Sequence, residues 1–208
     1  MNIDPLAVAI GFGVLLLSLT IHEAAHALTA DRLGDPTARA LGRVSLNPLV
    51  HIDLLGTVVL PLLAIISHLP IIGWAKPVPV NTRNLRHPQR DFAIVAAAGP
   101  ISNLLQAFVA AIIIRLVATD VYATEGVLSY ALLIAVQINV LLAFFNLIPV
   151  PPLDGGNVLM GLLPPRLAIG YAQLRQFGFL ILYALMLTGV ASALIMPPTR
   201  FMMRLLLP

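Results

Sequence analysis

Two histidines and a glutamate, His22, Glu23 and His26, lie inside a strongly apolar segment near the N-terminus. Histidines four positions apart share one face of a helix and can bind a single zinc ion. Glu23 follows the first histidine directly, where a general base for the water activated by such a metal is expected. Ionisable groups at membrane depth are costly and are usually functional, so the surroundings favour a metal site over two surface histidines.

A catalytic zinc takes three protein ligands and leaves one position open for water, so a third ligand is needed. The chain has no cysteine, which leaves histidine, aspartate and glutamate. Asp154 is the best candidate, because the prolines of Pro149–Pro152 stop the preceding helix and Gly155-Gly156 permits a tight turn. Its carboxylate could instead cap a short helix that starts near Asn157, and the two roles are compatible. The other candidates are His51, Asp53, His68, His87 and Asp91.

The composition is that of a polytopic integral membrane protein. Of the 208 residues, 59% are hydrophobic and 10% are charged, and the mean hydropathy is +0.96, whereas soluble domains carry about 25% charged residues. The basic residues cluster in loops, which indicates membrane topology and no nucleic-acid binding. We expect an all-α fold with about five or six transmembrane segments in a single domain, residues 1–208. Its catalytic core would span about residues 5–160, and an accessory segment residues 161–208.

Five hydrophobic segments must position these residues: 5–33, 54–72, 92–118, 127–148 and 177–196. The second is interrupted by glycine and proline, and it leads into residues 74–81. In that stretch Pro77 and Pro79 favour an extended backbone. His51 and Asp53 precede the second segment, where an interfacial structural role fits them better than a second metal site. His87 lies in a basic loop and is expected to be solvated.

Charge placement constrains the topology. The first segment ends at an arginine-bearing loop, so it runs from outside to inside and places His22 toward the cytoplasm. The acidic loop 120–125 is then outside, and the fourth segment brings Asp154 back to the cytoplasmic side. The stretch 54–81 must therefore make no net crossing, with residues 74–81 as a re-entrant or extended membrane-embedded element beside the active site. This element either pairs with an unfolded substrate by β-augmentation or acts as a structural plug.

The histidine motif of residues 22–26 and the sequence Asn-Leu-Ile-Pro-Val-Pro-Pro-Leu-Asp-Gly of residues 146–155 resemble the site-2 protease family of intramembrane zinc metalloproteases. Residues 98–103 are similar to an element in the middle core helix of that family, and the three blocks occur in the family's order. The chain looks like the compact branch of the family without a PDZ domain. The resemblance implies His22, His26 and Asp154 as ligands of one zinc ion per chain. It also implies Glu23 as the catalytic base.

The resemblance further implies hydrolysis of peptide bonds in or near transmembrane segments, in a lipid bilayer that would be a prokaryotic plasma membrane. The substrate would be a transmembrane protein or a signal-peptide-like segment, reached from the cytoplasmic side. Asn103 and Asn146 would handle the substrate or the oxyanion, although both could simply join membrane helices. Trp74 and Pro77 are substrate-contact candidates if residues 74–81 pair with the substrate; otherwise Trp74 is an interface anchor.

Two other function classes remain open from the residues alone. A metal or proton transporter could use intramembrane histidine and aspartate residues, but the inverted repeats typical of transporters are not evident in the sequence. A pseudoprotease could bind membrane helices without cutting them, but the intact Glu23 argues against it.

Overall fold

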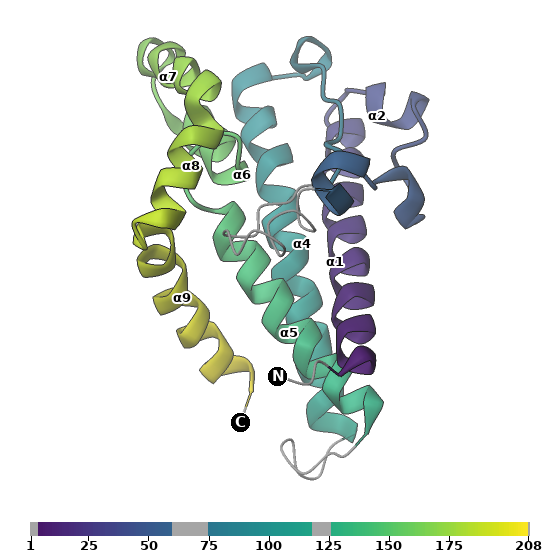
Figure 1. Cartoon of the computed structure of the whole chain (residues 1–208). Helices are drawn as coiled ribbons and strands as arrows, with labels where there is room; N and C mark the ends of the chain where they lie inside the picture. Colours follow the sequence, from purple (N-terminus) through teal and green to yellow (C-terminus); the bar gives the residue numbers. More distant parts are fainter. Residues whose placement is uncertain (1–3, 60–74, 118–125, 208) are drawn as a thin grey trace.

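Three long helices form the centre of the molecule (Figure 1). They are α1 (Pro5–Arg32), α4 (Pro88–Val117) and α5 (Val127–Asn146). The computed structural model describes residues 4–59, 75–117 and 126–207. Helix α4 packs against both α1 and α5, and all three helices are long and apolar enough to cross a membrane. The expectation of an all-helical membrane protein is confirmed, since the part of the chain that the structure describes contains no strand.

Shorter helical elements surround this core. They are α2 (Thr37–Ala40), η1 (Pro48–Val50), η2 (Leu54–Val59), η3 (Thr82–Asn84), α6 (Asp154–Leu162), α7 (Pro165–Ala172), η4 (Gln173–Phe177), α8 (Gly178–Leu187) and α9 (Val190–Leu206).

The segment 177–196, expected as one span, is instead divided between α8 and α9. Gly189, in the left-handed conformation at φ 76°, separates the two helices, and α9 continues through Pro197 and Pro198 to Leu206. The helical stretch 165–187 and α9 are bent by 74° relative to each other. The described residues therefore give three spanning helices, or four if this bent pair is one span. The expected five or six segments are not confirmed, and residues 60–74, which include most of the second segment, lie outside the described residues.

Capping residues set the ends of the long helices. Helix α1 begins after Asp4, whose carboxylate accepts the N–H of Leu6 at 2.9 Å. Helix α4 begins at Pro88, four residues before the predicted Phe92. The Asp91 carboxylate accepts the N–H of His87 at 2.8 Å and so satisfies a donor just ahead of the helix. Asp91, a candidate ligand on sequence grounds, is thus engaged at a helix terminus.

Small side chains allow the central helices to approach closely. Ala27 and Ala30 of α1 and Ala107 of α4 are completely buried, as is Ala143 of α5. In membrane bundles small residues permit backbone contact where large ones would hold the helices apart. Large apolar side chains point outward instead; Phe108, for example, is 53% exposed. This pattern suits a surface that is covered by lipid.

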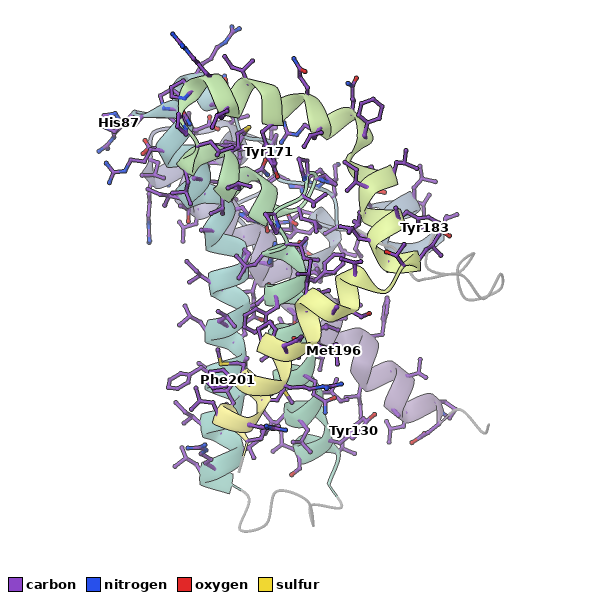
Figure 2. All side chains as sticks on the ribbon, turned by 90° about the vertical axis from the view of Figure 1, so that its left-hand side faces the viewer. His87, Tyr130, Tyr171, Tyr183, Met196 and Phe201 are labelled. Carbon is purple, nitrogen blue, oxygen red and sulfur yellow. The ribbon has the colours of Figure 1, made fainter. Side chains whose placement is uncertain are left out.

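Helix α1 ends and α4 begins at the same end of the bundle (Figure 1). The connection between α1 and α4 thus starts and finishes at one end of the bundle, and the re-entrant element expected within it is not confirmed. Helices α2 and α7, which carry Arg39 and Arg166, lie at this same end. Figure 2 shows His87 projecting outward here, far from Tyr130 at the opposite end. His87 is exposed, as expected for a solvated loop residue.

Candidate metal centre

The structure brings three of the predicted site residues, His22, His26 and Asp154, into one cluster. The two Nε2 atoms lie 3.1 Å apart. Asp154 Oδ2 lies 3.1 Å from Nε2 of His22 and 3.4 Å from Nε2 of His26. Both histidines are buried, and the Asp154 side chain is only 15% exposed. Among the described residues this is the one cluster of three such groups able to hold a metal ion.

Local structure explains how the three side chains meet. His22 and His26 stand one turn apart on α1 and point to the same side of it. Asp154 is the first residue of α6, and the N-cap residue, Leu153, makes no side-chain capping bond. Because the helix starts at Asp154 and not near residue 157, the carboxylate does not serve as the cap. A Cβ on Gly155 would lie 2.5 Å from the carbonyl oxygen of Ile148, so this turn requires glycine.

In their neutral form, both imidazoles present an unprotonated nitrogen to the cluster. His26 Nδ1 donates to the carbonyl oxygen of Val95 at 2.7 Å, a group that can only accept. His22 Nδ1 lies 2.6 Å from Oδ1 of Asn103 and donates to it. A neutral imidazole with a proton on Nδ1 carries a lone pair on Nε2. Two nitrogen lone pairs and a carboxylate oxygen therefore face one another in a buried site.

Three converging acceptors repel one another unless a cation lies between them. Asp154 Oδ2 is buried and has no hydrogen-bond donor among the described residues. A tetrahedral zinc ion with bonds of about 2.1 Å places its ligand atoms about 3.4 Å apart. The separations of 3.1–3.4 Å between the donor atoms of His22, His26 and Asp154 fit that arrangement. The donor set, two imidazoles and one carboxylate, is also one that zinc accepts in catalytic sites.

Gly99 forms the wall of the cluster on the α4 side. A Cβ at this position would lie within 2.5 Å of the Nε2 atoms of both His22 and His26. Real Cβ atoms essentially never come so close to another heavy atom. The glycine therefore lets α4 approach α1 while leaving room for the imidazoles.

Glu23 holds the extended stretch 75–81 against α1. Its Oε2 accepts the backbone N–H of Val78 at 3.2 Å. Pro77 and Pro79 have no N–H, so Val78 is the only donor between Lys76 and Val80. The described part of the proline-rich stretch lies beside Glu23, as the sequence predicted, and contains no helix before η3.

Other side chains fix the same stretch. The Arg43 guanidinium is buried and donates to the carbonyl oxygens of Lys76 and Pro77. The Lys76 N–H donates to the carbonyl of His51 at 2.8 Å. His51 Nε2 in turn donates to the carbonyl of Ser45 at 2.9 Å, so this side chain supports the loop and lies outside the metal cluster.

Asp35 ties the end of α1 to the start of η3. Its carboxylate, fully buried, accepts from Thr37 N and Oγ1, from Asn81 N at 2.7 Å and from Asn84 Nδ2 at 2.8 Å. Burial by itself raises the pKa of this carboxyl, but the hydrogen bonds from Thr37, Asn84 and Asn81 outweigh it and hold the pKa below its ordinary value. Asp35 thus stays ionised as the anchor of the 75–81 stretch.

Of the remaining predicted site residues that the structure describes, Asn103 contacts His22, whereas Asn146, Pro77 and Asp53 have other partners or are exposed. Asn146, at the end of α5, donates to the carbonyl of Leu142 at 3.0 Å. Asn103 is fully buried and engaged on both sides by protein groups, which favours a role in holding His22. Pro77 is exposed, Asp53 accepts the N–H of Gly56, and Trp74 and His68 lie outside the described residues.

Sequence reasoning missed four residues that shape the site: Ser18, Asp35, Arg43 and Asn139. Two of them carried a signal. Ser18 lies one turn before the first histidine and so on its face, and Asn139 is a polar residue inside the most apolar of the three spanning helices. Asp35 and Arg43 lie in the loop region after α1, whose fold no local sequence pattern predicts.

Comparison with known proteins places these features in a family. Residues 113–189 match Peptidase family M50. The chain is 35% identical over 189 residues to the Bacillus subtilis protein named "Putative zinc metalloprotease YwhC", an alignment that covers 88% of this chain and 82% of that protein. No solved structure matches the chain significantly.

Two mycobacterial proteins, both named "Putative zinc metalloprotease Rip2", are also similar. The one from Mycolicibacterium smegmatis is 34% identical over 176 residues, covering 83% of this chain and 64% of that protein. The one from Mycobacterium tuberculosis is 32% identical over 193 residues, covering 89% and 71% respectively. Because the similarity to YwhC extends over most of both chains, this protein belongs to peptidase family M50, the site-2 protease family.

Proposed function

We propose that this protein is a zinc-dependent peptidase that hydrolyses peptide bonds in or near transmembrane segments. In this proposal His22, His26 and Asp154 hold one zinc ion and Glu23 is the catalytic base. One observation carries the proposal: three buried acceptor atoms from α1 and α6 face one another at 3.1–3.4 Å. Membership of peptidase family M50 supports it.

The chemistry divides between the metal and Glu23. Zinc, when bound, supplies Lewis-acid activation of water and of the scissile carbonyl. Glu23 accepts a proton from water as the water oxygen bonds to the carbonyl carbon. It then passes that proton to the amide nitrogen as the C–N bond breaks. The Val78 N–H bond to Oε2 keeps the carboxylate turned toward the 75–81 stretch while it does so.

The substrate in this proposal is a membrane segment, from a transmembrane protein or a signal-peptide-like remnant. A helical substrate hides its carbonyl groups in backbone hydrogen bonds, so it must be locally unwound to be cut. A backbone that reaches Glu23 would lie beside residues 75–81, which is why we keep Pro77, with Trp74, as a candidate substrate contact. Asn146, near the turn that leads to Asp154, is a second.

The proposed location is a multi-pass arrangement in a prokaryotic plasma membrane with the site open to the cytoplasm. His22 lies ten residues before the end of α1, which is about 15 Å at the helical rise. The end it approaches is the one that carries α2, α7 and their arginines (Figure 1). By the positive-inside rule this end faces the cytoplasm, and water would enter from there.

We further propose that residues 1–208 form a single domain. The C-terminal segment contacts the core at several places, among them the apolar cluster of Ile148, Leu153 and Leu182. Leu206 of α9 belongs to the apolar cluster shared by α4 and α5, and a Cβ on Gly178 would collide with Pro151 beside the Asp154 turn. The accessory segment 161–208 is thus joined to the catalytic core 5–160.

The test is a reconstituted assay with purified protein, transmembrane peptide substrates in liposomes and metal analysis. We expect one zinc per chain in the wild type. His22→Ala should lose both zinc and cleavage, whereas Glu23→Gln should keep zinc and lose cleavage. Asp31→Asn is the matched control, because it makes the same carboxylate-to-amide change on α1 at a residue paired with Arg39. Undiminished cleavage by Glu23→Gln, or metal flux across the liposomes without cleavage, would refute the proposal.

A further inference from the structure

A series of hydrogen bonds between buried side chains leads from the metal cluster into the interfaces between the central helices. We infer that Asn139 and Ser18 are positioning residues that, through Asn103, fix which nitrogen of His22 carries the proton. This inference rests on the proposed metal site. It concerns residues that touch neither the metal donors nor a substrate.

The contacts cross three helices and return to the first. His22 Nδ1, on α1, lies 2.6 Å from Asn103 Oδ1, on α4. Asn103 Nδ2 donates to Asn139 Oδ1, on α5, at 2.8 Å. Asn139 Nδ2 donates to Ser18 Oγ, back on α1, and to the carbonyl oxygen of Ala135, both at 2.9 Å.

The direction of every bond follows from one group. The Ala135 carbonyl can only accept, so the NH₂ of Asn139 must face it. The side-chain oxygen of Asn139 then faces Asn103, so Asn103 must donate a hydrogen bond to it from its own NH₂. That leaves the oxygen of Asn103 facing His22, and Nδ1 of His22 must be the donor. The lone pair of His22 is thereby on Nε2, the atom that faces Asp154.

Burial makes these hydrogen-bond directions obligatory. Asn103 is 0% exposed, and Ser18 and Asn139 are each 2% exposed. A donor or acceptor left without a partner at such a place loses its hydrogen bonds to water and gains none in return, so reversed amides are disfavoured. If Asn139 were absent, Asn103 could rotate its amide and present NH₂ to His22. His22 would then carry its proton on Nε2 and could not bind a metal with that atom.

A purely structural role makes a different prediction. Buried asparagines also join membrane helices, and loss of that function lowers stability without changing metal affinity. The orienting role instead predicts a loss of zinc affinity, because groups that hold a metal-bound histidine typically change affinity about 10–100-fold when removed.

The experiment compares Asn139→Leu with Val136→Ala. Val136 is completely buried on the same helix, in the apolar cluster shared with α4. Zinc affinity is measured by competition with a chromophoric chelator, and cobalt substitution reports the ligand set by its visible spectrum. Melting temperature is recorded for each variant. We expect a loss of about 10–100-fold in zinc affinity and an altered cobalt spectrum for Asn139→Leu. Val136→Ala should be destabilised with unchanged affinity.

Two further variants keep the test decisive. Ser18→Ala removes one acceptor of Asn139 and leaves the Ala135 carbonyl, so the loss should be smaller, on the order of threefold. It replaces Asn139→Leu if that variant does not fold. In an Asn103→Leu background, Asn139→Leu should cause no further loss, because the two residues act in series.

The outcomes separate this inference from the proposed function. If the wild type binds zinc and His22→Ala does not, while Asn139→Leu and Ser18→Ala bind it as the wild type does, the orienting role is wrong and the metal site stands. If the wild type binds no zinc through His22, the proposed function itself fails.

Discussion

Substitution of Gly99 by alanine gives the sharpest test of the cluster geometry. The added Cβ would lie 2.5 Å from Nε2 of His22 and no farther from Nε2 of His26. Ordinary van der Waals contact begins at about 3.4 Å, so each nitrogen would have to retreat by roughly 0.9 Å. Metal–ligand distances tolerate only about 0.2 Å. The alanine therefore displaces both imidazoles from the arrangement that suits zinc.

We expect Gly99→Ala to weaken zinc binding by at least about 100-fold, which corresponds to roughly 2.7 kcal/mol. The assay is chelator competition on the purified protein, with zinc per chain measured by mass spectrometry. Cleavage of a transmembrane peptide should fall in parallel. The stability of helix α4 itself should not fall, because alanine is a better helix former than glycine by about 1 kcal/mol.

Gly13→Ala is the matched control. Gly13 is a helical glycine on α1, and a Cβ there would meet nothing within 4 Å. This variant should bind zinc as the wild type does. If Gly99→Ala also kept wild-type affinity while the His22→Ala variant lost it, the close approach of α4 to the imidazoles would be wrong.

Four further outcomes follow from the geometry. Asp35→Asn should lower the melting temperature at neutral pH. Because the folded-state pKa of Asp35 is lowered, the stability that its carboxylate contributes is present above about pH 4 and is lost as the pH falls through the folded-state pKa. The difference in melting temperature between variant and wild type should therefore shrink in acid. Val78→Pro removes the N–H held by Glu23 and should reduce kcat by about tenfold with zinc content unchanged; an unaltered kcat would mean that this bond does not orient the base. Gly155→Ala forces its Cβ against the Leu147 carbonyl and should weaken zinc binding by moving α6, as chelator competition would detect. Zinc removal by a chelator should lower the melting temperature, and zinc at about 100 times its Kd should restore roughly 2.7 kcal/mol of stability; equal melting curves with and without zinc would contradict the cluster.

Much of the helical core was legible in the sequence. The ends of α1 and α5 fall within two residues of the predicted segments, because a long apolar run between polar residues leaves one way to satisfy the backbone in lipid. The division of segment 177–196 into two helices at Gly189 could not be predicted, because hydropathy is averaged over many residues and is insensitive to a single left-handed residue. The expected count of five or six segments is therefore not confirmed by the described residues, which give three spanning helices or up to four.

The extended stretch before η3 illustrates the same limit. Its prolines predicted a non-helical backbone, and the topology argument placed it near the site. The sequence did not reveal what holds it there, namely the buried Arg43 guanidinium and the Asp35 carboxylate. Such partners depend on how a loop returns, and loop folds have no periodicity to read.

The sequence by itself determined the chemistry that this protein can attempt. It placed two imidazoles on one helical face, a carboxylate beside them, and a second carboxylate at a proline-bounded turn. Only the tertiary structure decided that His22, His26 and Asp154 converge as three acceptors. It also showed that Gly99, by lacking a side chain, leaves space for the two imidazoles. It also decided the protonation of His22, because the controlling contacts join residues 81, 36 and 121 positions apart in the chain. A local pattern fixes residue types and helix faces, whereas a tautomer depends on neighbours that only the packed helices bring together.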